Sequence, residues 1–187
     1  MPASHFLELV EPNLAQLPFY ADALERGWSP DNVRDVSKEQ LEAIRSHPAA
    51  FIEGLLQQGG IITLPDGSEV PKLPCRRRWI WDGEFVGNIS LRWQPGVDAL
   101  PEHVLGHIGY AVVPWKRRRG FATRALGLML DEAREVGLSR VEITTDTDNM
   151  PSRRVIEAND GRLIREFVNA RHGPNPKSLY LIDLDRQ

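Results

Sequence analysis

The sequence predicts an α/β (α+β) fold in which helices pack on a mostly antiparallel sheet. Apolar residues recur at helical spacing in the first 60 residues, whereas beyond the turn signal Asp82-Gly83 they recur at every second position. The rest of the chain alternates strand, helix, strand, helix and two closing strands. We expect a single domain over residues 1–187, with a helical region and irregular linker over 1–75 and a core over 76–187.

Three helices are predicted in the N-terminal region. Their apolar faces are formed by Leu14, Leu17, Ala21 and Leu24, by Leu41 and Ile44, and by Phe51, Ile52, Leu55 and Leu56. Gly27 ends the first helix, and Ser37-Lys38-Glu39-Gln40 has the form of a capping box that begins the second. Gly59-Gly60 ends the third, and the following Pro65-Asp66-Gly67-Ser68 indicates a turn.

The core shows a change of period at each predicted element. Strands are expected over 79–81, 85–93, 107–113, 140–146, 162–168 and 178–184. A long amphipathic helix is expected over 120–136, with Gly137 at its C-terminal end. A second helix begins at Asn149, a good N-terminal capping residue, and tolerates Pro151 in its first turn.

The charge balance argues against a general nucleic-acid binder, because the net charge is −3. The charges are unevenly placed. Residues 1–75 carry 11 acids and 5 bases, a difference of −6, while residues 76–187 carry 15 acids and 18 bases, a difference of +3. The positive part of the chain favours an anionic ligand, and the basic cluster at 116–119 is the first place to look for its site.

The composition indicates an ordinary soluble protein, and we expect it in the cytoplasm. The single cysteine, Cys75, cannot form an internal disulfide, which suits a reducing compartment. No apolar run approaches a membrane span, and no secretory signal is evident, so we expect no membrane partner. The five histidines and one cysteine lack the paired spacing of metal ligands, so no metal is expected.

The segment 108–123 carries the strongest functional signal. A strand ending in Val-Val-Pro leads through Trp115-Lys116 into Arg117-Arg118-Arg119-Gly120-Phe121-Ala122-Thr123, which opens the long helix. The first N–H groups of a helix lack internal partners and lie at the positive end of its dipole, so they attract anions. Gly120 and Ala122 let a pyrophosphate approach the backbone, and the arginines add charge. Taken alone, a solvated basic surface is the alternative.

Two motifs in order resemble one family. The pattern Arg-x-x-Gly-x-Ala after a strand resembles the main signature of the GCN5-related N-acetyltransferase (GNAT) family. About 30 residues later, Asn149-x-x-Ser152-x-x-Val155-Ile156-Glu157 resembles the next block of that family. The closer likeness is to the ribosomal-protein alanine acetyltransferases and similar bacterial proteins, and it covers roughly residues 76–185. It implies helices on both faces of the central sheet, with the N-terminal helices as an extension.

The resemblance implies acetyl-CoA as co-substrate and acetyl transfer to a primary amine by direct attack in a ternary complex. Val112 and Val113 would offer backbone groups to the pantetheine, beside a β-bulge. The residues expected around the pyrophosphate are Arg117, Arg118, Arg119, Gly120, Phe121, Ala122 and Thr123. Asn149 and Ser152 would lie near the pantetheine and the thiol.

Catalytic residues are less clearly indicated. Many relatives carry a tyrosine proton donor on the second helix, where this chain has Ile156, so Ser152 is the candidate for hydrogen-bonding the thiol. A serine in a first helical turn also often satisfies only a backbone group. His107 and Glu102 are candidate bases, although the first suits a structural role and the second a solvated loop. Glu142, on the strand after the long helix, is expected to face outward, and a water chain is a further alternative for the base.

Other functions and several acceptors stay open at this stage. A non-catalytic acyl-CoA-binding module is favoured by the missing tyrosine, and a nucleic-acid patch ranks below it because no recognition-helix pattern is present. The acceptor is a small-molecule amine or a peptide or protein amine: a protein N-terminus, a lysine, an amino acid, a polyamine or an aminoglycoside. The acidic N-terminal helices either favour a cationic amine or form a structural cap. A homodimer is possible, since dimers are common among the relatives.

Overall fold

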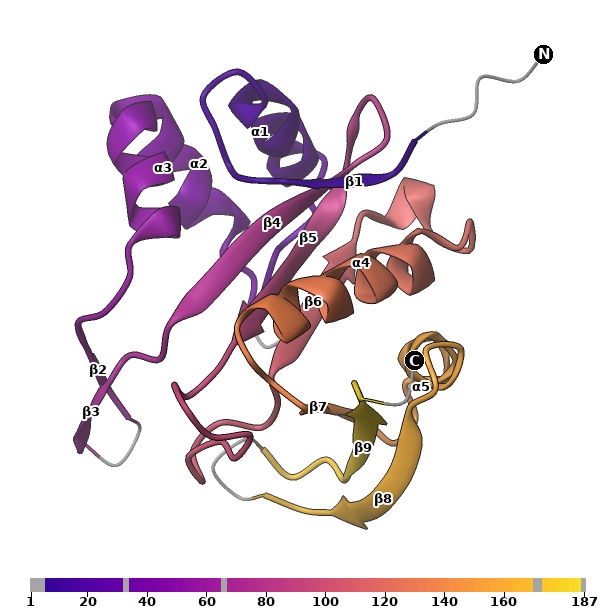
Figure 1. The fold of residues 1–187 in the computed structure, drawn as a ribbon. Coiled ribbons are helices and arrows are strands. Elements are labelled where there is room, and N and C mark those ends of the chain that lie inside the picture. The colour runs from indigo at the N-terminus through magenta and orange to yellow at the C-terminus, as the bar shows by residue number, and fades with distance from the viewer. Residues whose placement is uncertain (1–5, 32–33, 65–66, 170–172, 186–187) are drawn as a thin grey trace. The chain divides into compact units, whose positions relative to one another are not determined.

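The computed structural model describes residues 6–31, 34–64, 67–169 and 173–185. The predicted helices and the predicted strands from β4 (Cys75–Trp81) onward follow one another in the predicted order (Figure 1). The elements are β1 (Glu8–Val10), α1 (Leu17–Glu25), α2 (Ser37–Ser46), α3 (Pro48–Leu56), β2 (Ile61–Thr63), β3 (Glu69–Pro71), β4 (Cys75–Trp81), β5 (Phe85–Arg92), β6 (Ile108–Val112), the 3-10 turn η1 (Pro114–Lys116), α4 (Phe121–Glu135), β7 (Arg140–Asp146), α5 (Met150–Glu157), β8 (Arg162–Phe167) and β9 (Lys177–Asp183).

The described strands form three hydrogen-bonded sheets, in the orders β1-β4-β5-β6, β2-β3 and β7-β9-β8. The β1–β4, β2–β3, β7–β9 and β8–β9 pairs all run antiparallel. The predicted α/β class with mostly antiparallel pairing and N-terminal helices is therefore confirmed. The short strands β1, β2 and β3 were not predicted. The turn predicted at 65–68 falls between β2 and β3, and its first two residues lie outside the described part of the chain.

The chain divides into two compact units. The first comprises Met1–Gln57, Arg76–Ser90 and Tyr110–Leu128. Its core is aromatic: the Tyr20 ring stacks on Trp79 at 5.1 Å between centroids, and Trp28 and Phe85 meet it edge-on. Leu17, Leu24, Ile44 and Ile52 from α1, α2 and α3 join the same cluster. Such aromatic pairs contribute roughly 0.5–1.5 kcal/mol beyond the apolar area they bury, so this cluster fastens the helices to β4 and β5.

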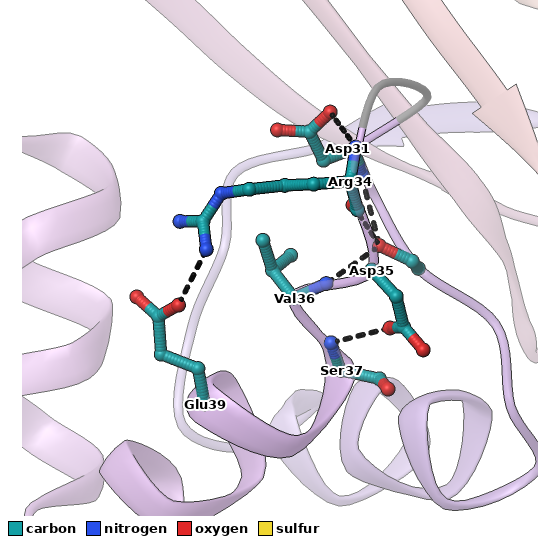
Figure 2. A network of polar contacts seen from close by, with 7 residues as sticks. Asp31, Arg34, Asp35, Val36, Ser37 and Glu39 are labelled. Atoms are coloured by element: carbon teal, nitrogen blue, oxygen red, sulfur yellow. Dashed lines mark hydrogen bonds and ion pairs between the residues drawn. The ribbon is translucent and has the colours of Figure 1, made fainter.

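The segment between α1 and α2 is held by its own polar side chains (Figure 2). The predicted capping box at Ser37 is wrong, because α2 begins at Ser37 and no side chain caps it in that pattern. Instead, the Asp35 carboxylate accepts the Ser37 N–H at 2.9 Å. Hydrogen bonds from Ser37 hold the pKa of Asp35 below its usual value. An exposed ion pair, Arg34–Glu39 at 3.0 Å, closes the turn.

The second unit comprises Gln58–Cys75, Leu91–Gly109 and Met129–Gln187. Its main sheet, β7-β9-β8, has two different faces. Val141, Ile143, Tyr180 and Ile182 are buried on one face, as the alternation along β7 and β9 requires. The residues between them, such as Glu142, lie on the opposite face and are only partly buried.

Two classes of feature are absent from the part of the chain that the structure describes. No helix there is long and apolar enough to cross a membrane. No group of three or more His, Cys, Asp or Glu residues is placed to hold a metal ion.

Candidate active site

The loop between η1 and α4 turns sharply through two residues with left-handed backbone conformation. Arg118 has φ 58° and Gly120 has φ 75°. Glycine adopts this conformation without penalty, whereas arginine does so at a modest cost, so the loop holds Arg118 in a conformation that it rarely adopts by itself. Left-handed residues in a turn direct successive N–H groups toward a common point, which is an arrangement that binds anions.

The N-terminus of α4 is open and basic. Its first intrahelical bond beyond the loop runs from Arg124 N–H to the Gly120 carbonyl at 3.1 Å, so the N–H groups of Phe121 and Ala122 precede it. No acidic residue lies in the first turn to offset the positive end of the dipole. A Cβ atom added at Gly120 would meet nothing within 4 Å. These features fit the approach of a pyrophosphate to the backbone.

The arginines of the loop have different surroundings. Arg117 donates from Nε to the Val112 carbonyl at 3.0 Å and thereby ties the loop back to the end of β6. The Arg119 guanidinium lies 5.0 Å from the centroid of the Phe121 ring. Phe121 is only 5% exposed, so its side chain anchors the helix and only its backbone is placed for a ligand. Arg118 and Arg119 are exposed and are the loop's candidate phosphate ligands.

Lys116 has a different role from its neighbours. Its ammonium lies 2.6 Å from Asp82 Oδ1, and the two side chains are only 7% and 4% exposed. It also lies 3.0 Å from Glu84 Oε2, whose side chain is 70% exposed. The pair ties the β4–β5 turn to η1, directly before the loop. Sequence reasoning counted Lys116 in the basic cluster and took Asp82 for a turn residue, so it missed this contact.

The strand end predicted to receive the pantetheine is closely packed. A Cβ atom at Gly87 would lie 2.1 Å from the Ala111 carbonyl oxygen and 2.9 Å from Val112 Cα, so only glycine allows β5 and β6 to approach this closely. The Val113 N–H donates to the Val86 carbonyl at 2.9 Å and is therefore already engaged. Of the two predicted backbone donors, this leaves Val112 as the candidate.

In the second unit, Asn149 caps α5 as predicted, because its Oδ1 accepts the Ser152 N–H at 3.2 Å. This contact gives both residues a structural role. Their contact with the pantetheine and the thiol stays a prediction. Ile156 is fully buried, so the position where relatives carry a tyrosine points into the core and offers no hydroxyl.

His107 is fully buried and fastens the entry of β6 to β7. The ring Nδ1 of His107 accepts the Glu142 backbone N–H at 2.9 Å, and the backbone N–H of His107 donates to the Glu142 carbonyl at 2.7 Å. Burial lowers the pKa of His107. Because the Nδ1 lone pair is already engaged, the proton of the neutral ring sits on Nε2, which has no hydrogen-bond partner among the described residues. This geometry gives no support to the role of a catalytic base.

Glu102, the other predicted base, lies in the loop before β6 and is exposed. It lines a cavity of about 500 Å³ together with Glu142. The structure therefore brings together two carboxylates that lie 40 residues apart in the sequence (142 − 102). Sequence reasoning had expected Glu142 to face outward and had no signal that would join it to Glu102.

Comparison with known proteins agrees with this geometry. The model of the acetyltransferase (GNAT) family matches residues 38–161. No curated protein is significantly similar to the chain in sequence. Among solved structures, RimL, a ribosomal L7/L12 alpha-N-protein acetyltransferase in complex with coenzyme A, is 19% identical with a TM-score of 0.66, covering 100% of this chain and 98% of its own.

Two further structures share the fold. Mycobacterium smegmatis RimJ, in complex with a CoA-disulfide, is 21% identical with a TM-score of 0.64, covering 96% of this chain and 82% of its own. The putative acetyltransferase yncA of Salmonella typhimurium, with acetyl-CoA, is 15% identical with a TM-score of 0.55, covering 97% of this chain and 95% of its own. At these identities, the likeness establishes the fold.

Proposed function

Because the chain belongs to the acetyltransferase (GNAT) family, we propose that it transfers the acetyl group of acetyl-CoA to a primary amine, by direct attack of the amine on the thioester in a ternary complex. The observation that carries this proposal is the open, basic N-terminus of α4. Solved relatives with the same fold contain CoA or acetyl-CoA, which supports the choice of co-substrate.

Three kinds of group in the loop would bind the pyrophosphate. The N–H groups of Phe121 and Ala122 donate to its oxygens, where the helix dipole adds to the attraction. Arg118 and Arg119 neutralise its charge, and a guanidinium can donate to two phosphate oxygens at once. Gly120 leaves the space that a side chain would fill. Arg117 and the Thr123 hydroxyl are proposed as additional contacts at the edges of the loop.

The chemistry requires a neutral amine, a polarised thioester carbonyl and a proton for the thiolate. Holding the amine next to the thioester removes several kcal/mol of the barrier by itself. We assign polarisation of the carbonyl to the Val112 N–H and a hydrogen bond at the thiol to Ser152. Glu102 is a better candidate base than the buried His107, because its carboxylate is accessible to solvent.

A non-catalytic acyl-CoA-binding module is the second candidate, and the buried Ile156 favours it, since that position supplies no proton donor. The two functions differ in turnover. Tight binding of acetyl-CoA without thiol release for any amine would support the binding module, whereas amine-dependent thiol release would support the enzyme.

The test is titration calorimetry with acetyl-CoA on the native chain and on two variants of one position. Gly120→Glu and Gly120→Gln impose the same left-handed backbone strain and nearly the same volume, so they differ only in charge. We expect native binding, a moderate loss in the glutamine variant and at least a tenfold further loss in the glutamate variant, with thermal unfolding as the control for folding. Equal affinities for both variants, or no binding by the folded native chain, would remove the pyrophosphate from this loop.

A further inference from the structure

The cavity that contains Glu102 and Glu142 lies entirely within the second unit. One wall is a face of the β7-β9-β8 sheet and the other is the loop over residues 100–105. The register places the sheet residues together: Arg165 pairs with Leu179, and Glu142 pairs with Leu181, two residues along the same strand. Because alternate residues share a face, these side chains lie on the face opposite the buried core. The volume of about 500 Å³ is typical of a small-molecule site.

The loop that covers this face is fastened at both ends. At its start, Asp98 accepts the Ser139 N–H at 2.9 Å and the Ser139 hydroxyl at 2.5 Å, and these bonds hold the pKa of Asp98 below its usual value. At its end, the Thr144 hydroxyl donates to the Leu105 carbonyl. A Cβ atom at Gly106 would lie 3.1 Å from the Glu142 carbonyl, so the loop lies tightly against β7. The cavity is therefore preformed, which lowers the entropic cost of binding.

The charges in the cavity are arranged in two opposed groups. Glu102 and Glu142 have no ion-pair partner among the described residues. Arg165 comes from β8, on the other side of β9 from Glu142, and its guanidinium lies 5.0 Å from the centroid of the Phe167 ring. The walls between them are apolar and include Leu100, Val104, Leu105 and Leu179. The site thus presents acceptors for a cation, a donor for an anion and an apolar surface.

We infer that this cavity binds a small zwitterion, an α-amino acid with an apolar side chain. Its ammonium lies between Glu102 and Glu142, its carboxylate pairs with Arg165, and its side chain covers the apolar wall. β7 and β8 lie on either side of β9, roughly 10 Å apart. Glu142 and Arg165 line the same cavity of about 500 Å³, so a ligand that contacts both charges is small.

A diamine is disfavoured because Arg165 repels its second ammonium, and a peptide N-terminus lacks the adjacent carboxylate that a guanidinium pairs with most strongly.

Calorimetry at pH 7 tests the ligand class, with L-leucine, L-leucinamide and 1,5-diaminopentane as probes. We expect L-leucine to bind at least tenfold tighter than the other two. Arg165→Gln should weaken L-leucine at least tenfold and leave L-leucinamide unchanged, while Glu142→Gln should weaken both. Arg162→Gln is the matched control, because Arg162 is exposed on the same strand and does not line the cavity. An equal loss in Arg162→Gln, or equal binding of L-leucine and the diamine, would overturn the inference.

A second measurement separates this inference from the proposed function. Acetyl-CoA binding should be the same in native protein, Glu142→Gln and Arg165→Gln, which also shows that the variants fold. Native protein that binds acetyl-CoA but not L-leucine refutes the cavity inference alone. L-leucine binding without acetyl-CoA binding refutes the proposed function and leaves the cavity inference standing.

Discussion

The buried ion pair between Lys116 and Asp82 makes a specific prediction about the cofactor loop. Lys116 is the last residue of η1 and directly precedes Arg117, so any movement of its side chain is transmitted to the loop backbone. The perturbation is Lys116→Met, which keeps most of the aliphatic stem and removes the ammonium. Asp82, whose side chain is 4% exposed, then loses the Lys116 ammonium. We expect both lower stability and weaker acetyl-CoA binding.

The magnitude follows from the contact itself. At 2.6 Å and an effective dielectric constant of about 20, the gross attraction is roughly 6 kcal/mol. Desolvation of the two charges offsets much of this, but breaking a buried ion pair by removing one partner costs about 3–5 kcal/mol. For a chain of this length, that corresponds to a decrease in Tm of about 10 °C. The Glu84 contact involves a carboxylate that is 70% exposed, so Glu84→Gln should cost less than about 1 kcal/mol.

Urea unfolding and acetyl-CoA calorimetry on the same samples measure the two effects separately. The double variant Lys116→Met, Asp82→Asn removes both charges and should recover much of the stability lost in the single variant. A Lys116→Met chain as stable as native would show that the pair is not buried. Lost stability with unchanged acetyl-CoA affinity, measured where the variant is folded, would show that the pair stabilises the unit without positioning the loop.

Two further changes test the backbone packing and the buried histidine. Gly87→Ala should cost more than about 2 kcal/mol and weaken acetyl-CoA binding, because its Cβ would lie 2.1 Å from the Ala111 carbonyl oxygen. Gly109→Ala should be tolerated, because its Cβ would lie 3.6 Å from Arg92 Nη2, an ordinary van der Waals contact. For His107, burial lowers the folded-state pKa, so the unfolded state binds more protons as pH falls below about 6.5. Native stability should therefore be complete above about pH 6.5 and decrease below it, by up to about 1.4 kcal/mol for each pH unit, until the folded-state pKa is reached. His107→Asn keeps a hydrogen-bond acceptor and should flatten this decrease, which urea unfolding at several pH values measures. An unchanged pH profile would show that His107 does not cause the decrease.

The elements that sequence predicted well are those with many regular positions. The strand at 140–146 was predicted with the bounds of β7, because it is rich in β-branched residues. The long helix from 120 was predicted almost as closely, since its apolar stripe continues over four turns. The strands β1, β2 and β3 have only three residues each, too few for a period to be visible, and they depend on pairing with distant segments.

The candidate site divides in the same way between local and distant information. The loop over residues 117–123 could be proposed as a phosphate-binding loop because its glycine, arginines and helix start are contiguous in the chain. The buried position of His107 could not be predicted, because it depends on contacts with Glu142, 35 residues away. The pairing of Lys116 with Asp82 spans 34 residues, and nothing in either residue's neighbours indicates it. Glu102 was proposed as a base from its loop alone, but its proximity to Glu142 required the fold.

The four cations at 116–119 show that the number of charges in a run of sequence is not the number available to bind an anion. Lys116 is neutralised in the core, and Arg117 uses its Nε to hold the end of β6. Arg118 and Arg119 are exposed beside the open amides of α4, and neither is used to hold the end of β6. The expected consequence is an asymmetry between neighbours: charge at 118 and 119 acts on the anion directly, whereas Lys116 acts through the backbone that carries the loop. Affinity for acetyl-CoA should then fall as salt is added, because salt screens the charges of Arg118 and Arg119. The contribution of the Lys116–Asp82 pair should hardly change, because a buried pair is screened far less.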